Sequence, residues 1–464
     1  MELDKIDIPL KNTLLSLFET NKNQLFSHDT PTAKILREAA IRNFEKLGFP
    51  DRSLEKWKST DLTETLLRNY KIYVQSIDGV ADIEDIFTCH VTNLDTYVIT
   101  QVNGWVNAKN RELTTLPGGA IVGSLELARK KYPELIDTHY GKYAEIEKNA
   151  LNAINTAFSQ DGIFIYLPDN VHLSKPIQIV NIINRDENIF VQPRHLVIVG
   201  KNSKLTLLHC DHSTKHQHSF SNAVTEIYIG ENSHVDHYKI QNKDNDSTLI
   251  SNTYIHQEAN SQLLNNTITL NGGLIRDNLH VKMNGAGCDS NLYGLYLVDR
   301  TQHVDHNTFV DHAAPHCRSN ELYKGILDEQ AKAVFNGHIL VRKDSQKTIA
   351  YQNNKNILLT DEARINAKPH LEIYADDVKC SHGATVGQLD PEAMFYLRSR
   401  GICEHSAKML LMYAFAAEVI NTISIEPLKE QINDLVSRRL RGELSGCEHC
   451  ALGCKGCEEI NLLG

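Results

Sequence analysis

The chain has 464 residues, of which 41% are hydrophobic, and this is enough apolar material for a large buried core. Its 58 acidic and 48 basic side chains give a formal net charge of -10, and no basic run suited to a phosphate backbone occurs, so nucleic acid is not an expected partner. No segment reaches the roughly 20 apolar residues of a membrane span, and the N-terminus lacks the apolar stretch of a signal peptide. We therefore expect no membrane contact and a cytoplasmic location.

Residues 1–158 are predicted to form a mainly helical domain that contains one small β-hairpin. Apolar residues at helical spacing predict a helix over residues 31–47. Further along, the pair Asn103-Gly104 lies between β-prone stretches, which is the strongest short signal for a hairpin. Helical character then returns over residues 124–158.

Residues 159–387 are predicted to form a right-handed parallel β-helix. Short β-prone runs recur there after turns of small residues, and the serines that follow those turns recur at a nearly constant interval, at Ser203, Ser233, Ser261 and Ser290. A unit as long as this interval cannot bury its apolar face alone, so successive units must stack. A β-sandwich would instead show hairpin signals about every 8–12 residues, and few such pairs occur.

Residues 388–445 are predicted to form a C-terminal helical domain, a small bundle. Asp390 is a suitable N-cap for a first helix with proline in its first turn, and two more helices are expected over residues 404–423 and 427–440. The chain then ends in a cysteine-rich tail, residues 446–464. The expected fold class is mainly β, with a β-helix core between two helical domains.

A first group of polar residues lies in a stretch rich in histidine and aspartate. If this stretch is a strand, His306 and His312 share a face but stand about 20 Å apart, and His303 points to the other face. One strand cannot chelate a metal with them. We expect hydrogen-bonded ladders with neighbouring strands instead.

A second candidate is the pair Cys380 and His382, which are two residues apart in an extended segment. Both side chains then leave the same face about 7 Å apart, so a thiolate and an imidazole can converge on one metal. Two ligands do not complete a site, and the others would have to come from elsewhere, including a partner chain. The alternative is a half-buried cysteine beside a hydrogen-bonded histidine.

A third candidate is the Cys-x2-Cys-x3-Cys-x2-Cys array of the tail, formed by Cys447, Cys450, Cys454 and Cys457. Four thiolates suit zinc or an iron–sulfur cluster by ligand type. The spacer between the two pairs is short compared with the roughly 15–20 residues of zinc sites. The alternative is a set of exposed reactive thiols on a mobile extension.

Several blocks of sequence together resemble the SufB/SufD family. They are the stretch Glu-Lys-Trp-Lys-Ser-Thr-Asp-Leu at residues 55–62, residues 161–168 with Pro176, residues 303–316 with Tyr323-Lys324-Gly325, the block at 368–387, and its continuation at 395–402. The resemblance extends to about Leu440. The residues around Trp57 and those around His382 favour the SufD branch over the SufB branch.

This resemblance implies a non-catalytic scaffold subunit of the SufBCD complex for iron–sulfur cluster assembly. The β-helix would pair with a SufB-like paralogue, and the C-terminal helices would dock a SufC-like ABC-type ATPase. The chain has no phosphate-binding loop of its own, so ATP would enter only through that partner. A nascent cluster would be shared with SufB, with His382 as the acceptor on this side and Cys380 as a weaker candidate. The tail departs from the family pattern, a homodimer is expected to be accessible in isolation, and flavin binding is left open.

Two other functions compete with this one. A β-helix is also the fold of many carbohydrate-active enzymes, although these are commonly secreted. A structural adaptor that never binds metal is the other alternative. Co-purification with an ATPase separates the scaffold from the sugar enzyme, and anaerobic reconstitution with iron and sulfide separates it from the adaptor.

Overall fold

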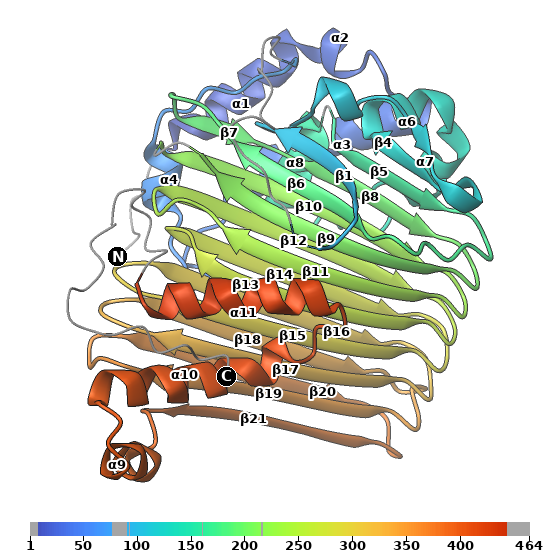
Figure 1. Cartoon of the computed structure of the whole chain (residues 1–464). Coiled ribbons are helices and arrows are strands. Elements are labelled where there is room, and N and C mark those ends of the chain that lie inside the picture. Colours follow the sequence, from blue (N-terminus) through green and yellow to red (C-terminus); the bar gives the residue numbers. More distant parts are fainter. Residues whose placement is uncertain (1–7, 77–90, 92, 160, 215–216, 443–464) are drawn as a thin grey trace.

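The computed structural model describes residues 8–76, 91, 93–159, 161–214 and 217–442, and a two-sheet parallel β-helix occupies most of it (Figure 1). One sheet has ten strands in the order β2-β1-β6-β9-β11-β13-β15-β17-β19-β21. The other has eleven strands, ten of them in the order β20-β18-β16-β14-β12-β10-β8-β5-β4-β3, with β7 paired to β10. Because strands that follow each other along the chain alternate between the sheets, the predicted β-helix is confirmed.

The strands of the ten-stranded sheet are β1 (Tyr97–Val102), β2 (Trp105–Val106), β6 (Ile177–Ile183), β9 (Lys204–Ser213), β11 (His234–Asn242), β13 (Gln262–Asn271), β15 (Asp289–Val298), β17 (Arg318–Leu327), β19 (Ile349–Leu358) and β21 (Lys379–Gly387). Those of the eleven-stranded sheet are β3 (Thr114–Thr115), β4 (Ile121–Ser124), β5 (Ile163–Leu167), β7 (Ile189–Val191), β8 (Arg194–Val199), β10 (Ser219–Ile229), β12 (Ser247–Gln257), β14 (Leu274–Met283), β16 (His303–His312), β18 (Lys332–Val341) and β20 (Arg364–Ile373). The helices are α1 (Pro9–Thr20), α2 (Lys22–Leu25), α3 (Pro31–Leu47), α4 (Thr63–Leu67), α6 (Leu125–Lys131), α7 (Pro133–His139), α8 (Ala150–Phe158), α9 (Pro391–Ser399), α10 (Glu404–Ile420) and α11 (Glu426–Leu440).

Asparagines form the repeated turns that precede strands of the ten-stranded sheet. Asn202, Asn232 and Asn260 have φ values of 52°, 57° and 57°, in the left-handed region that asparagine tolerates better than most residues. Their side-chain amides also form a ladder along the turns, with Nδ2–Oδ1 distances of 3.1 Å between Asn232 and Asn202 and 3.2 Å between Asn260 and Asn232. These turns are the physical basis of the repeat in the sequence.

One step of the predicted repeat is wrong. Gln262 pairs with Asp289 in the register of β13 and β15, so the residue that follows Ser261 in the stack is Cys288, not Ser290. This step of the repeat is therefore shorter than the serine spacing predicts. The turn at this step is closed by Gly287, whose φ is 75°.

The N-terminal region contains the predicted helix, α3, and the predicted hairpin around Asn103 and Gly104, which have φ values of 51° and 88°. Strand β1 of that hairpin also pairs in parallel with β6, so the hairpin belongs to the ten-stranded sheet and not to the helical unit. The helical stretch predicted over 124–158 is three helices, α6, α7 and α8. Helix α8 packs over the eleven-stranded sheet, where Asn155 Nδ2 donates to the carbonyl oxygens of Pro193 and Asn222.

The three C-terminal helices are confirmed, and α10 contacts both α9 and α11. Helices α10 and α11 lie across the outer face of the ten-stranded sheet (Figure 1). Val419 and Ile420 of α10 belong to one apolar cluster with Leu295 and Ile326 of that sheet. The sheet turns apolar side chains outward here, and the helices cover them. No helix within the described ranges is long and apolar enough to cross a membrane.

Candidate functional site

The interior of the β-helix holds a polar column beside its apolar core. Side chains alternate along each strand, so every second residue points inward. Leu207 and Ile227 are among the inward residues of the apolar part. In the polar part, Lys239 Nζ lies 2.5 Å from Ser251 Oγ and forms a buried ion pair with Asp277 of the opposite sheet. The interior of the β-helix therefore contains buried charged side chains as well as apolar ones.

Toward the C-terminal end, this column contains a buried carboxyl group, Glu321. Thr308 Oγ1 donates to its Oε2 atom at 2.6 Å, and Gln352 Nε2 donates to its Oε1 atom at 3.2 Å. Burial raises the pKa of Glu321 to about 7. Gly337 provides the room for this contact, because a Cβ atom at that position would lie 2.2 Å from Gln352 Nε2.

The predicted pair, Cys380 and His382, lies on the last strand of this sheet, β21. In the parallel register of β19 and β21, His382 is the partner of Gln352, and Cys380 is the partner of Ala350. Both residues therefore continue the inward-facing rows, on one face of the strand as the alternation predicts. His382 is exposed and Cys380 is half-buried, and burial raises the pKa of the Cys380 thiol. Their role as ligands stays a prediction.

The end of the β-helix beyond His382 is open. Ile373 and Val386 occupy positions that are inward-facing in earlier turns of the helix, yet they are 40% and 51% exposed. Their partners one strand earlier, Val341 and Asn356, are only 0% and 3% exposed. In the described part of the chain, no strand covers the free edges of β20 and β21. A hollow of about 350 Å³ also opens beside the end of β21, next to Phe415 of α10.

The histidine-rich stretch is strand β16, and its histidines do not converge. His303 Nε2 lies 2.9 Å from Thr60 Oγ1, and His312 Nε2 lies 2.9 Å from Ser319 Oγ. The two histidines thus bind separate partners on opposite faces of the strand. The expected hydrogen-bonded ladder is wrong for His306, which packs between the rings of Tyr296 and Tyr323 and has no hydrogen-bond partner among the described residues.

The stretch around Trp57 has a structural role that the sequence did not reveal. It crosses the outer face of the eleven-stranded sheet, where the Trp57 ring lies 3.9 Å from the Arg276 guanidinium carbon. Thr60 Oγ1 donates to Asp305 Oδ2 at 2.5 Å, and Arg276 Nη1 pairs with the same carboxylate oxygen, also at 2.5 Å. The motif thus fastens the N-terminal region to strands β14 and β16.

Glu321 and Gln352 were also missed. Along the chain, Glu321, Gln352 and His382 follow one another at nearly the same interval as the serines of the turns. Carrying the repeat from the serine turns to the C-terminal strands would therefore have suggested that the three lie near one another, although the varying turn lengths leave the exact register open. The tail cysteines Cys447, Cys450, Cys454 and Cys457 lie outside the described residues.

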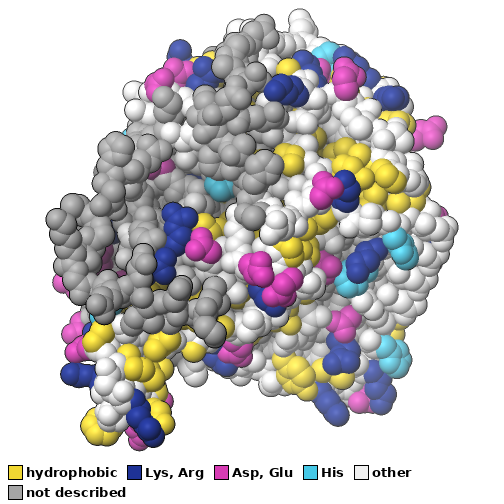
Figure 2. All heavy atoms as spheres, in the orientation of Figure 1, with side chains coloured by type: hydrophobic (Ala, Val, Ile, Leu, Met, Phe, Trp, Pro, Cys, Tyr) yellow, Lys and Arg dark blue, Asp and Glu magenta, His cyan; other side chains and the backbone are white. Residues whose placement is uncertain are grey.

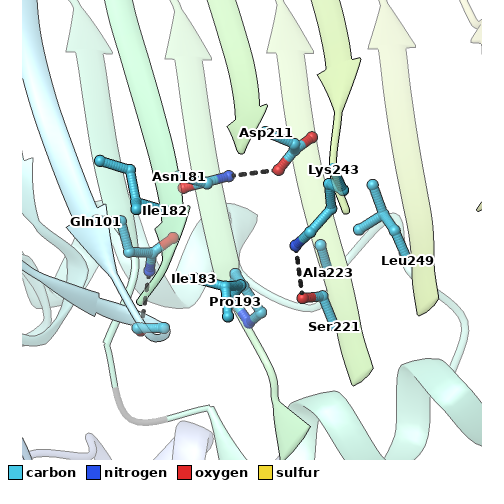
Figure 3. A pocket seen from close by; sticks show the side chains of 11 residues that line it. Gln101, Asn181, Ile182, Ile183, Pro193, Asp211, Ser221, Ala223, Lys243 and Leu249 are labelled. Atoms are coloured by element: carbon cyan, nitrogen blue, oxygen red, sulfur yellow. Dashed lines mark hydrogen bonds between the residues drawn. The ribbon is translucent and has the colours of Figure 1, made fainter. Parts of the chain in front are cut away.

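A small cavity lies at the other end of the β-helix (Figure 3). Lys243 Nζ donates to Ser221 Oγ at 3.1 Å, and Asn181 Nδ2 donates to Asp211 Oδ1 at 3.1 Å. Burial lowers the pKa of Lys243 to about 8. The cavity volume of about 10 Å³ leaves room for about one water molecule and excludes a larger ligand. The open end near His382 is therefore the better candidate site.

Comparison with known proteins identifies the family. A family model described as the SufBD core domain of SUF system FeS cluster assembly matches residues 181–415, and one described as the SufBD protein N-terminal region matches residues 9–179. An iron–sulfur cluster assembly SufBD family protein of Synechocystis is 32% identical over 87% of this chain and 90% of its own length.

Two further relatives carry the name SufD. The Escherichia coli protein is 28% identical over 87% of this chain and 92% of its own length, and the Bacillus subtilis protein is 25% identical over 89% and 95%. The chain therefore belongs to the SufBD family of iron–sulfur cluster assembly proteins, and it is of the SufD type.

Proposed function

We propose that this chain is a scaffold subunit that pairs through the open end of its β-helix with a SufB-like paralogue and presents His382 to a nascent iron–sulfur cluster at the junction. The observation that carries the proposal is the uncovered last turn of the helix. Strand β20 is the last strand of the eleven-stranded sheet, and β21 is the last strand of the ten-stranded sheet. Each presents one edge of N–H and C=O groups that no described strand pairs with, and such edges are templates for pairing with another chain. A second β-helix with a similar end supplies matching edges.

The side chains at this end suit a shared metal site. Imidazole and thiolate both bind iron, and His382 and Cys380 leave the same face of β21. Two ligands leave coordination positions open, which the partner's side chains would fill. The cluster is the cargo of such a site, and the SufD names of the relatives support this assignment.

Docking of a SufC-like ATPase is assigned to the C-terminal helices. Helix α9 projects from the β-helix (Figure 1), and hydrophobic side chains gather on this projection at the lower left of Figure 2. Phe395 and Tyr396 are 75% and 57% exposed, and no residue of α9 is buried. Exposed apolar groups of this size mark protein interaction sites. ATP hydrolysis would belong to that partner, and this chain would act without catalysis of its own.

Cluster assembly tests the His382 assignment. The full chain, purified with SufB-like and SufC-like partners, is reconstituted anaerobically with iron and sulfide, and the cluster is followed by its visible absorbance. His382→Ala is expected to lower cluster yield several-fold while the complex stays intact, because one ligand of a shared site is lost. Ser381→Ala is the matched control, since Ser381 lies on the same strand but points to the opposite face. Equal yields from the two variants would contradict the assignment.

Docking is tested separately by co-purification. Replacing Phe395 and Tyr396 together by aspartate is expected to abolish capture of the ATPase while capture of the SufB-like chain is retained, because the substitutions place charge on an exposed apolar face. Undiminished ATPase capture would move the docking site away from α9.

A further inference from the structure

We propose that His338, His370 and Glu372 form a binding site for one divalent transition-metal ion on the outer face of the eleven-stranded sheet. One ligand atom from each of the three side chains lies within 4.8 Å of the other two. The cluster lies on the opposite face of the strands from the inward-facing rows that end at His382, and it contains no thiolate.

The sheet itself brings the three residues together. His338 of β18 and His370 of β20 are direct partners in the parallel register, so their side chains stand side by side on one face. Glu372 is two residues beyond His370 and leaves β20 on that same face. The centroids of the two imidazole rings lie 4.7 Å apart, and the interplanar angle is 79°, so the rings do not stack face to face.

The carboxylate is already oriented toward the histidines. The Tyr374 hydroxyl donates to Glu372 Oε1 at 2.5 Å, which leaves Oε2 directed at His338, 3.1 Å from its Nε2 atom. A hydrogen bond that fixes one oxygen of a ligating carboxylate is the usual support around a metal site. Ligand atoms around a bound zinc-like ion stand about 3 to 3.5 Å apart, so small rotations of the His370 ring complete the geometry.

The donor set selects the class of ion. Two imidazoles and one carboxylate suit zinc, cobalt and ferrous ions, whereas calcium and magnesium prefer oxygen ligands alone. The three side chains are only half-buried or exposed, so water can take the remaining coordination positions. Lys56, in the stretch around Trp57, places a positive charge near His338, and this charge opposes a bound cation. Lys56→Gln is therefore expected to tighten metal binding.

The chain offers a close control for this cluster. His256 and Glu258, also on the outer face of the eleven-stranded sheet, form another histidine–glutamate pair with the same 3.1 Å separation. Among the described residues, no third potential metal ligand lies close enough to this pair to complete a site. A simple ion pair and a metal site can thus be compared within one protein.

Anaerobic cobalt titration of the full chain, without partners or cluster, tests the proposal. Bound cobalt is counted by equilibrium dialysis, and thiolate-to-cobalt charge-transfer absorbance separately reports any binding by Cys380 or by the tail cysteines. His370→Ala and Glu372→Gln are each expected to lose one equivalent of cobalt with unchanged charge-transfer absorbance, whereas His256→Ala keeps it. Circular dichroism checks that each variant is folded.

Either of two results would overturn the site. Folded His370→Ala and Glu372→Gln variants that bind as much cobalt as the natural chain would show that the cluster is only an ion pair. Retention of that equivalent in folded His370→Ala together with its loss in His382→Ala would place the ion at the open end instead. Because the measurement needs no partner and no cluster, its failure would leave the proposed scaffold function untouched.

Discussion

Glu321 is a buried acid whose protonation is coupled to folding. Burial raises its pKa from 4.5 to about 7, so between these values the folded chain holds a proton that the unfolded chain releases. The free energy of unfolding therefore falls as the pH rises through this window. Glu321→Gln keeps the neutral form, and its amide can still accept from Gln352 and donate to Thr308. We expect the variant to exceed the natural chain in free energy of unfolding at pH 8 by on the order of 1–3 kcal/mol.

Urea unfolding near pH 4.5 and at about pH 8 measures this difference. It should nearly vanish at the lower pH, because Glu321 is then protonated in the folded chain and already about half protonated in the unfolded chain. Glu362→Gln is the control, because Glu362 is exposed and should change stability equally little at both pH values. A Glu321→Gln variant that is less stable than the natural chain at pH 8 would show that the buried carboxylate is charged and favourably bound.

Residue positions were predictable where they depend on local alternation. Cys380 and His382 were placed on one face because the period of a strand is fixed by its backbone. The neighbours of His382 were not predictable in the same way. Whether Gln352 and Glu321 line up with His382 depends on how many residues each intervening turn of the β-helix contains. Those lengths vary, as the shift from Ser290 to Cys288 shows.

At the scale of elements, the asparagine turns are expected to stabilise the stack mainly through backbone conformation. Asn232 has a φ of 57° and bonds through its side chain to Asn202 and Asn260. Asn232→Ala is expected to lower the free energy of unfolding by about 1–2 kcal/mol, since a Cβ without a local polar partner disfavours the left-handed region. Urea unfolding at fixed pH provides the measurement.

Asn232→Gly separates the two contributions. Glycine adopts the left-handed region without steric cost but lacks the side-chain ladder, so it should lose clearly less stability than alanine. Equal losses in the two variants would mean that the amide ladder, and not the backbone conformation, accounts for the role of Asn232.

The existence of the C-terminal helices was predictable, but the surface on which they pack was not. Asp390 caps α9 as expected, with its carboxylate accepting from the backbone N–H groups of Glu392 and Ala393. The position of α10, in contrast, depends on Leu295 and Ile326, which face outward from the sheet. Their strands also carry buried residues on the inner face, so no alternation of apolar and polar residues marks the covered face.

At the scale of the whole molecule, the two ends of the β-helix differ. At the N-terminal end the two sheets finish in the antiparallel pairs β1–β2 and β3–β4, and α8 shares an apolar cluster with Phe190 and Phe220. The C-terminal end leaves Ile373 and Val386 exposed, and the polar column reaches it at His382. An open apolar end on an otherwise closed core is expected to be covered by a partner, because exposed strand edges otherwise pair without specificity.

Charges at this end should therefore weaken pairing without weakening the fold. Replacing Ile373 and Val386 together by lysine is expected to raise the dissociation constant for the SufB-like partner at least tenfold, about 1.4 kcal/mol, because the lysines would be desolvated at the junction. The melting temperature of the isolated chain should hardly change, since both positions are already 40% and 51% exposed. Tyr351→Lys is the matched control: Tyr351 is 40% exposed but lies on the outer face of β19, one strand in from the open edge, with its side chain pointing away from the core. Sedimentation velocity of the mixed chains measures the affinity, and equal weakening by the control would show that added charge alone, and not its place at the open end, disrupts the pair.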